Sequence, residues 1–87
     1  MNKYERVAEH IVDLHGFTTK EAETILNELI KNAEYKHVRV ITGKGKFRET
    51  GPVMRNFVEH YLEDHDIKFG TSKLYNGGEG AFEVYLD

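Results

Sequence analysis

The order of the regular segments constrains this fold more than any other feature of the sequence. Residues 10–15 and 38–41 contain β-branched side chains and predict two strands, each followed by a helical stretch. Residues 67–75 and 81–86 predict two further strands joined by a hairpin. Because β-α-β crossovers are right-handed, both helices should cover one face of the sheet. The sequence therefore predicts an α/β fold, a two-layer βαβαββ sandwich with a four-stranded mixed sheet, whose strand order stays open.

Each helical segment carries one apolar stripe. Thr18 and Glu21 fit a capping box at the start of the first, in which each side chain accepts the other residue's backbone N–H. The second follows Pro52, at the favoured first position of a helix, and fades near His65. Apolar residues at helical spacing are Ala22, Ile25, Leu26, Leu29, Ile30 and Ala33 in the first segment, and Val53 or Met54, Phe57, Val58, Tyr61 and Leu62 in the second.

The 87 residues are expected to form one domain, with residues 1–9 as a lead-in and residues 10–87 as the folded unit. A chain that is 39% hydrophobic and 31% charged is typical of globular proteins, which argues against disorder. The absence of cysteine excludes disulfides and thiolate metal sites. No apolar run approaches the ~18 residues of a membrane span, and no signal peptide is evident. We therefore expect a small soluble protein of the cytoplasm.

The charges are segregated along the chain. Between Lys36 and Arg55 six basic residues and one acid, Glu49, give +5, although the whole chain carries −3. The remaining segments therefore carry −8. One basic segment on an acidic body indicates a local anion site. A solvated charged surface is the alternative.

Topology places three glycine-rich turns on one edge of the predicted sheet. The turns at residues 13–16 and 42–45 each follow a parallel strand, so they must be neighbours. If the third strand is also parallel, the hairpin at residues 76–80 joins them. Open α/β sheets bind ligands beyond the carboxyl ends of their strands, where helix N-termini offer N–H groups to anions. This edge is therefore expected to hold the functional site.

Asp13 and His15 form a candidate catalytic pair on that edge. Residues two apart on a strand share a face, so the two side chains should meet while Leu14 points away. A carboxylate beside an imidazole fixes the tautomer of the ring, which suits general acid–base chemistry on a phosphodiester. A purely structural hydrogen bond that closes the strand is the alternative.

The second turn, Thr42 to Gly45, allows the backbone to approach an anion, and Lys44 adds charge. It lacks the glycine spacing of a Walker loop, and a simple turn between strand and loop is the alternative. The remaining histidines fit no metal-ligand spacing and are expected at the surface: His10, His37, His60 and His65.

Together these motifs resemble the Smr (small MutS-related) domain. The resemblance rests on Asp13-Leu14-His15-Gly16, Thr42-Gly43-Lys44-Gly45, Gly51-Pro52-Val53-Met54-Arg55 and Gly77-Gly78-Glu79-Gly80-Ala81, in this order, and on the ending Val84-Tyr85-Leu86. It spans roughly residues 10–87. It implies a βαβαββ sandwich like the C-terminal domain of bacterial translation initiation factor three, and endonuclease activity. Some family members nick or bind DNA, and others cleave messenger RNA, including on stalled ribosomes.

The resemblance implies an endonuclease that cleaves RNA and/or nicks DNA, with Asp13 and His15 as its catalytic residues. Three positions bear on this. The second motif, which often opens with histidine or threonine, has Thr42, and a His-Ser pair common soon after it is replaced by Phe47 and Arg48. The residues expected to contact nucleic acid are Thr42, Gly43, Lys44, Gly45, Lys46, Arg48, Arg55, Gly77 and Gly78.

No cofactor is required for this chemistry. General acid–base catalysis contributes roughly 10²–10⁴-fold, and charge stabilisation by the N–H groups of Gly43 and Gly45 would contribute a similar factor. The edge has no cluster of three carboxylates, which disfavours a two-metal mechanism, whereas a single Mg²⁺ between Asp13 and a phosphate is compatible. RNA or DNA, and the ribosome, are the expected partners, with no membrane. A non-catalytic nucleic-acid or ribosome-binding module and a protein- or phosphopeptide-binding module remain the alternatives.

Overall fold

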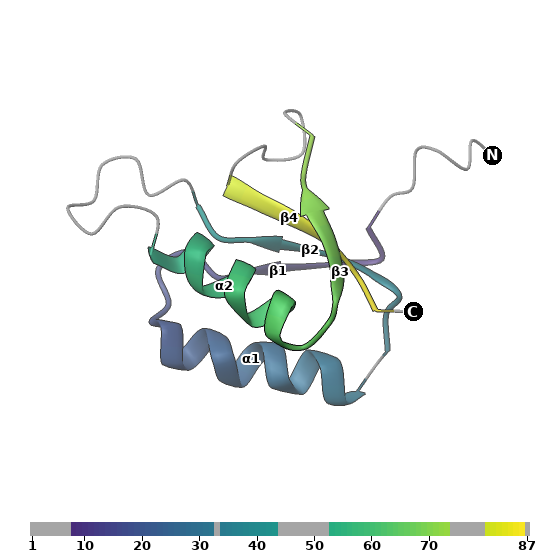
Figure 1. Cartoon of the computed structure of the whole chain (residues 1–87), viewed down its shortest axis with the longest axis horizontal. Helices are drawn as coiled ribbons and strands as arrows, with labels where there is room; N and C mark the ends of the chain where they lie inside the picture. Colours follow the sequence, from purple (N-terminus) through teal and green to yellow (C-terminus); the bar gives the residue numbers. More distant parts are fainter. Residues whose placement is uncertain (1–7, 33, 44–52, 74–79, 87) are drawn as a thin grey trace.

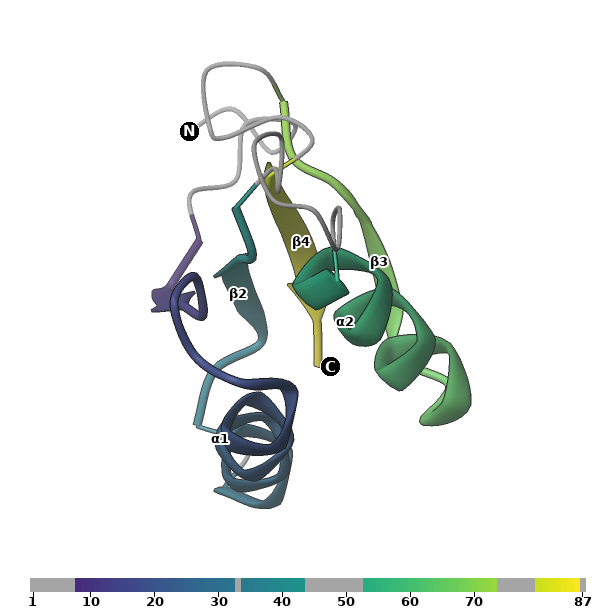
Figure 2. The ribbon, with the colours of Figure 1, turned by 90° about the vertical axis from the view of Figure 1, so that its left-hand side faces the viewer.

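The computed structural model describes residues 8–32, 34–43, 53–73 and 80–86. The elements in chain order are β1 (His10–Asp13), α1 (Thr19–Asn32), β2 (His37–Ile41), α2 (Val53–Asp64), β3 (Lys68–Thr71) and β4 (Ala81–Tyr85). They form one sheet in the order β1-β2-β4-β3 (Figure 2), in which β1 is parallel to β2, and β4 is antiparallel to both β2 and β3. β3 therefore runs in the same direction as β1 and β2, and the predicted βαβαββ mixed sheet is confirmed.

The three parallel strands end on one edge of the sheet, where β4 begins. Backbone hydrogen bonds join the segments at this edge, from Leu14 to Ile41, from Thr42 to Gly80 and from Ser72 to Ala81. The expected proximity of the turns after β1 and β2 is confirmed. Residues 76–79 of the predicted hairpin lie outside the described residues, and Gly80 is adjacent to the turn after β2.

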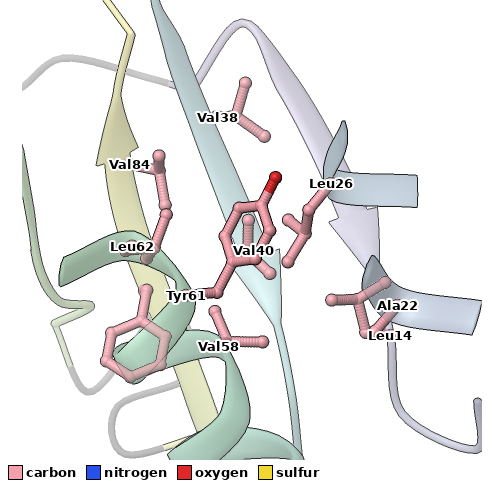
Figure 3. Packing of buried hydrophobic residues seen from close by; sticks show 10 residues of the cluster. Leu14, Ala22, Leu26, Val38, Val40, Val58, Tyr61, Leu62 and Val84 are labelled. Carbon is pink, nitrogen blue, oxygen red and sulfur yellow. The ribbon is translucent and has the colours of Figure 1, made fainter. Parts of the chain in front are cut away.

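Both helices pack against the same face of the sheet (Figure 1), because inward residues of both share one hydrophobic core with every second residue of the strands. Tyr61 of α2 lies between the helices and β2 (Figure 3), and its hydroxyl donates to Asn27 Oδ1 of α1 at 2.6 Å. The buried cluster consists of Leu14, Ala22, Leu26, Val38, Val40, Val58, Tyr61, Leu62, Phe82 and Val84.

Three strands are shorter than predicted. β1 stops at Asp13 because the Asp13 carboxylate turns the chain at His15, while Leu14 is fully buried and its N–H still donates to Ile41 of β2. β3 covers only residues 68–71, since Ile67 instead closes the turn after α2 by donating its N–H to Leu62. β4 ends at Tyr85. The part of the predicted third strand beyond residue 73 lies outside the described residues.

The helix-free face of the sheet carries a polar network that places one histidine in the interior. The carboxylate of Glu83 accepts from His37 Nε2 at 2.5 Å, from Arg39 Nε at 2.7 Å and from the hydroxyl of Ser72. His37 also stacks on Tyr85 and is buried, so its expected surface position is wrong. The other three histidines, His10, His60 and His65, are exposed as predicted.

Candidate nuclease site

Asp13 and His15 meet through a tight turn at the end of β1 rather than along the strand. Asp13 Oδ1 lies 2.5 Å from His15 Nδ1 and also accepts the backbone N–H of His15 at 3.1 Å. The chain then turns through Gly16, whose φ of 88° is a left-handed conformation that glycine adopts without strain. The predicted contact is therefore present, but an aspartate-centred turn produces it.

The side chains of Asp13 and His15 are open to solvent, and their hydrogen bond determines which ring nitrogen of His15 carries the proton. The side chain of His15 is 67% exposed and that of Asp13 is 46% exposed. The hydrogen bond from His15 holds the pKa of the Asp13 carboxyl below its usual value, despite partial desolvation. An ionised carboxylate only accepts hydrogen bonds, so Nδ1 carries the proton that it donates to Asp13. In the described part of the chain no group bonds to Nε2, which is thus available to a substrate.

The beginning of α1 supports this turn from the other side. The N–H of Thr18 donates to Glu21 Oε1 at 2.8 Å, and the N–H of Glu21 donates to Thr18 Oγ1 at 3.1 Å. The predicted capping box is confirmed. It fixes the start of α1 only a few residues after His15, so the histidine is held between the end of a strand and the start of a helix.

Gly43 brings the turn after β2 against the histidine. A Cβ atom built on Gly43 would lie 3.4 Å from the Cβ atom of His15, and the φ of Gly43 is 79°. The N–H groups of Thr42 and Gly43 both donate to the carbonyl of Gly80, at 2.8 and 3.1 Å. The N–H that we expected from Gly43 for charge stabilisation is therefore engaged within the protein. Gly43 instead provides close packing behind His15.

The structure places the other predicted site residues in three ways. Thr42 is buried, and its hydroxyl bonds to the carbonyls of Gly43 and Gly80, so its side chain holds the turn together. Arg55 lies over the ring of Phe82, with its guanidinium 4.9 Å from the ring centroid, and reaches Glu59 and Thr71. Six residues fall outside the described residues: Lys44, Gly45, Lys46, Arg48, Gly77 and Gly78.

Phe17 is a neighbour of the site that the sequence reasoning did not single out. It follows Gly16 directly, and its side chain is 45% exposed although it is large and apolar. Its N–H donates to the carbonyl of Leu14 at 3.1 Å, which closes the turn that holds His15. The sequence did contain a signal for Phe17, because this aromatic residue lies in a turn, outside the apolar stripe of the following helix, and is therefore not placed in the core by that stripe.

Among the described residues of this edge, Asp13 is the carboxylate that could bind a metal ion beside His15. Asp13 offers a carboxylate that already accepts from His15 through Oδ1. Within residues 8–32, 34–43, 53–73 and 80–86, no three histidine, aspartate or glutamate side chains are grouped as metal ligands require.

In the same ranges no helix is long and apolar enough to span a bilayer.

The protein is a small α/β sandwich in which an aspartate–histidine turn packs against a glycine turn at the carboxyl ends of parallel strands. The Smr domain model matches residues 12–87, and the chain belongs to the Smr domain family. This family is associated with nuclease activity and nucleic-acid binding. A comparison with curated protein sequences gives no significant match.

Solved Smr structures share the fold at low sequence identity. The Smr domain of Thermus thermophilus MutS2 superposes with a TM-score of 0.76 at 24% identity, over 90% of this chain and 98% of that one. YdaL, a stand-alone small MutS-related protein from Escherichia coli, gives 0.68 at 22% identity over 87% and 63% of the two chains. The B3BP Smr domain gives 0.66 at 25% identity over 88% and 77%.

Proposed function

We propose that this Smr domain is an endonuclease that cleaves RNA, and nicks DNA more slowly, with His15 as the proton-transferring residue and Asp13 as its orienting partner. The observation that carries the proposal is that only one of the two ring nitrogens of His15 bonds to Asp13. Asp13 binds Nδ1, while Nε2 faces solvent at the edge where the chain leaves β2, shortly before Lys44, Lys46 and Arg48 in the sequence. A fixed tautomer with one free nitrogen is the arrangement that general acid–base catalysis uses.

For RNA the proposed step needs only groups present in the chain, the substrate and water. His15 Nε2 takes the proton of a 2′-hydroxyl as its oxygen attacks the adjacent phosphorus. The new O2′–P bond forms as the P–O5′ bond breaks, and water protonates the leaving 5′-oxygen. The products are a 2′,3′-cyclic phosphate and a 5′-hydroxyl. DNA lacks the internal nucleophile and would require an activated water, which accounts for the slower nicking.

Charge stabilisation is assigned to the basic segment. Lys44, Lys46 and Arg48 would neutralise the phosphate, since cations aimed at a developing negative charge lower the barrier in acyl and phosphoryl chemistry. A single Mg²⁺ between Asp13 and the phosphate remains compatible with this arrangement. Activity that survives EDTA would assign the stabilisation to the protein alone.

The test is a comparison of cleavage products. Purified wild-type chain and His15→Ala are incubated with end-labelled RNA, with the same RNA carrying one 2′-deoxynucleotide at each mapped cleavage position, and with DNA. We expect cyclic-phosphate ends, loss of cleavage at deoxy positions, and at least ~100-fold slower cleavage by His15→Ala with nearly unchanged binding. Equal cleavage by the variant would remove His15 from the mechanism.

A non-catalytic nucleic-acid-binding module is the second candidate. The replacement by Phe47 and Arg48 of the His-Ser pair that is common in the family favours it, because the chain then lacks the histidine of that pair. This candidate predicts salt-dependent retention of RNA by wild type and by His15→Ala alike, without strand cleavage by either.

A further inference from the structure

An open pocket borders the edge strand β1 at the end opposite the candidate nuclease site. It has a volume of about 270 Å³ and lies between the helix side of β1 and the second half of α1. Val12, Ile25 and Leu29 supply apolar lining, while Glu28 and Glu34 supply carboxylates. Asp13 ends β1 and His15 follows it, whereas the other end of β1 carries His10, which lines the pocket and whose ring stacks on Tyr35 at 4.5 Å.

Within the described residues, no strand pairs with the outer edge of β1. In the described part of the chain β1 pairs only with β2 and is the outermost strand (Figure 2). An edge strand directs the N–H and C=O groups of every second residue away from its partner and can accept another strand. Ile11 is 52% exposed on the side of β1 that faces away from the helices. The edge thus has an apolar contact on one side and the pocket on the other.

We propose that β1 and this pocket form a docking site for an extended segment of a partner protein in which basic and apolar residues alternate. The segment adds a fifth strand beside β1, so its side chains alternate between the two sides of the sheet. Those on the helix side enter the pocket, where lysine or arginine stems lie on Leu29 and Ile25 and the cationic groups reach Glu28 and Glu34. Those on the other side pack against Ile11.

The negative charge of Glu28 and Glu34 favours a basic segment in the pocket over a second copy of this chain and over a polynucleotide. Neither Glu28 nor Glu34 has an ion pair or hydrogen bond within the described residues, so both carboxylates are available to a cationic partner. A second copy of the chain related by a two-fold axis through β1 would bring the Glu28 side chains toward each other, which is unfavourable. A polynucleotide would place phosphates beside the same carboxylates.

The probe is an acetylated peptide in which lysine and valine alternate, titrated into the isotope-labelled full chain and followed by amide NMR. We expect shifts in residues 10–13 and 25–32 with no change at His15. Glu28→Gln and Glu34→Gln should each weaken binding about threefold, as for exposed ion pairs. Glu63→Gln, an exposed glutamate on α2, is the matched control and should bind like wild type.

Two methylated peptides test the strand pairing itself. One carries N-methyl groups on all lysine amides and the other on all valine amides, so each removes the N–H groups of one edge of the added strand. Strand addition predicts that one of them binds about tenfold more weakly or worse, and that the other binds like the parent.

Several outcomes would overturn the proposal. Absence of binding, or equal behaviour of the two methylated peptides, excludes strand addition. If the chain forms dimers as its concentration rises, and the amide signals of β1 shift with dimer formation, the edge would be assigned to a second copy of the chain. Binding that is gained only after deletion of residues 1–7 would assign it to this chain's own N-terminal residues. Shifts of the same amides by RNA would assign it to nucleic acid.

Discussion

The carboxylate of Asp13 holds both the ring and the backbone of His15, since one oxygen, Oδ1, lies 2.5 Å from Nδ1 and 3.1 Å from the amide nitrogen. A carboxylate that binds only the ring would leave the histidine free to swing with its backbone. Here the same oxygen sets the turn and the ring together. Orientation of Nε2 therefore depends on Asp13 twice, once through each hydrogen bond.

This relationship predicts the effect of Asp13→Asn. The amide oxygen can still accept from the backbone N–H of His15, but the negative charge that fixes the Nδ1–H tautomer is lost. We expect slower single-turnover cleavage, by less than the ~100-fold or more expected for His15→Ala, with nearly unchanged binding. Asp64→Asn, at the exposed end of α2, is the control. An Asp13→Asn rate below that of His15→Ala would give the carboxylate a role beyond orientation.

The sequence predicted the features that depend on local pattern. Helical spacing and the Thr18–Glu21 capping box located α1, and the order of elements brought Asp13, His15 and Gly43 to one edge. The position of β4 between β2 and β3 stayed open, because long-range strand pairing leaves no local periodic signal.

Two errors at the sequence level have the same origin. His37 was expected at the surface, but its burial depends on Glu83 and Tyr85, which belong to a strand nearly fifty residues later. The N–H of Gly43 was assigned to an anion because nothing local reveals that Gly80 accepts it. Both contacts are set by the pairing of β2 with β4, which residue spacing within β2 cannot report.

Three glycine substitutions separate packing from backbone strain at the site. Gly43→Ala adds a methyl group 3.4 Å from His15 Cβ at a φ of 79°, whereas Gly16→Ala has a comparable φ of 88° and no neighbour within 4 Å. Both should lose about 1–2 kcal/mol of unfolding free energy. Gly43→Ala should in addition slow cleavage more than Gly16→Ala does.

Gly70→Ala is the control for this comparison, because Gly70 has neither a positive φ nor a neighbour within 4 Å of an added Cβ. Unfolding is followed by denaturant titration and cleavage by single-turnover assay. If Gly43→Ala and Gly70→Ala unfold at the same denaturant concentration, the left-handed backbone at Gly43 is not strained by a side chain.

The core predicts unequal costs for leucine truncation. The sequence pattern placed Leu26, Leu29, Phe57 and Leu62 inside the protein, and the structure buries Leu26 and Leu62 to 1% exposure while the other two are partly buried. Leu26→Ala and Leu62→Ala should each cost ~2–5 kcal/mol of unfolding free energy, the range for fully buried leucines. Leu29→Ala should cost less. A larger loss for Leu29→Ala than for Leu26→Ala would contradict this packing.

The basic segment predicts a salt signature for nucleic-acid binding. Lys44→Ala, Lys46→Ala and Arg48→Ala should each weaken affinity for RNA and for DNA with little sequence preference. Each should also lower the slope of log affinity against log salt by about one unit, as for one lost phosphate contact. Glu23→Ala, on the exposed side of α1, is the control. Three unchanged slopes would place the binding surface elsewhere.

The partly buried carboxylate of Glu83 predicts how stability depends on pH. Burial opposes ionisation of this group, but hydrogen bonds from Arg39, Ser72 and His37 outweigh it and hold its pKa below the usual value of 4.5. The unfolded chain therefore takes up a proton at Glu83 before the folded chain does. The stabilisation is fully present above that usual value and is lost as the pH falls through the lower pKa of the folded state.

Glu83→Gln removes this titration and should make the free energy of unfolding fall less steeply below about pH 4.5 than it does in wild type. At neutral pH the variant should also be less stable, because Arg39 and His37 lose a charged partner in a largely buried position. Denaturant titrations from about pH 7 to about pH 3 measure both effects, with Glu63→Gln as the exposed control. Because Asp13 and Glu9 also have lowered pKa values, some acid dependence should persist in Glu83→Gln. Parallel wild-type and Glu83→Gln curves would mean that the carboxylate gains no net stabilisation from its three donors.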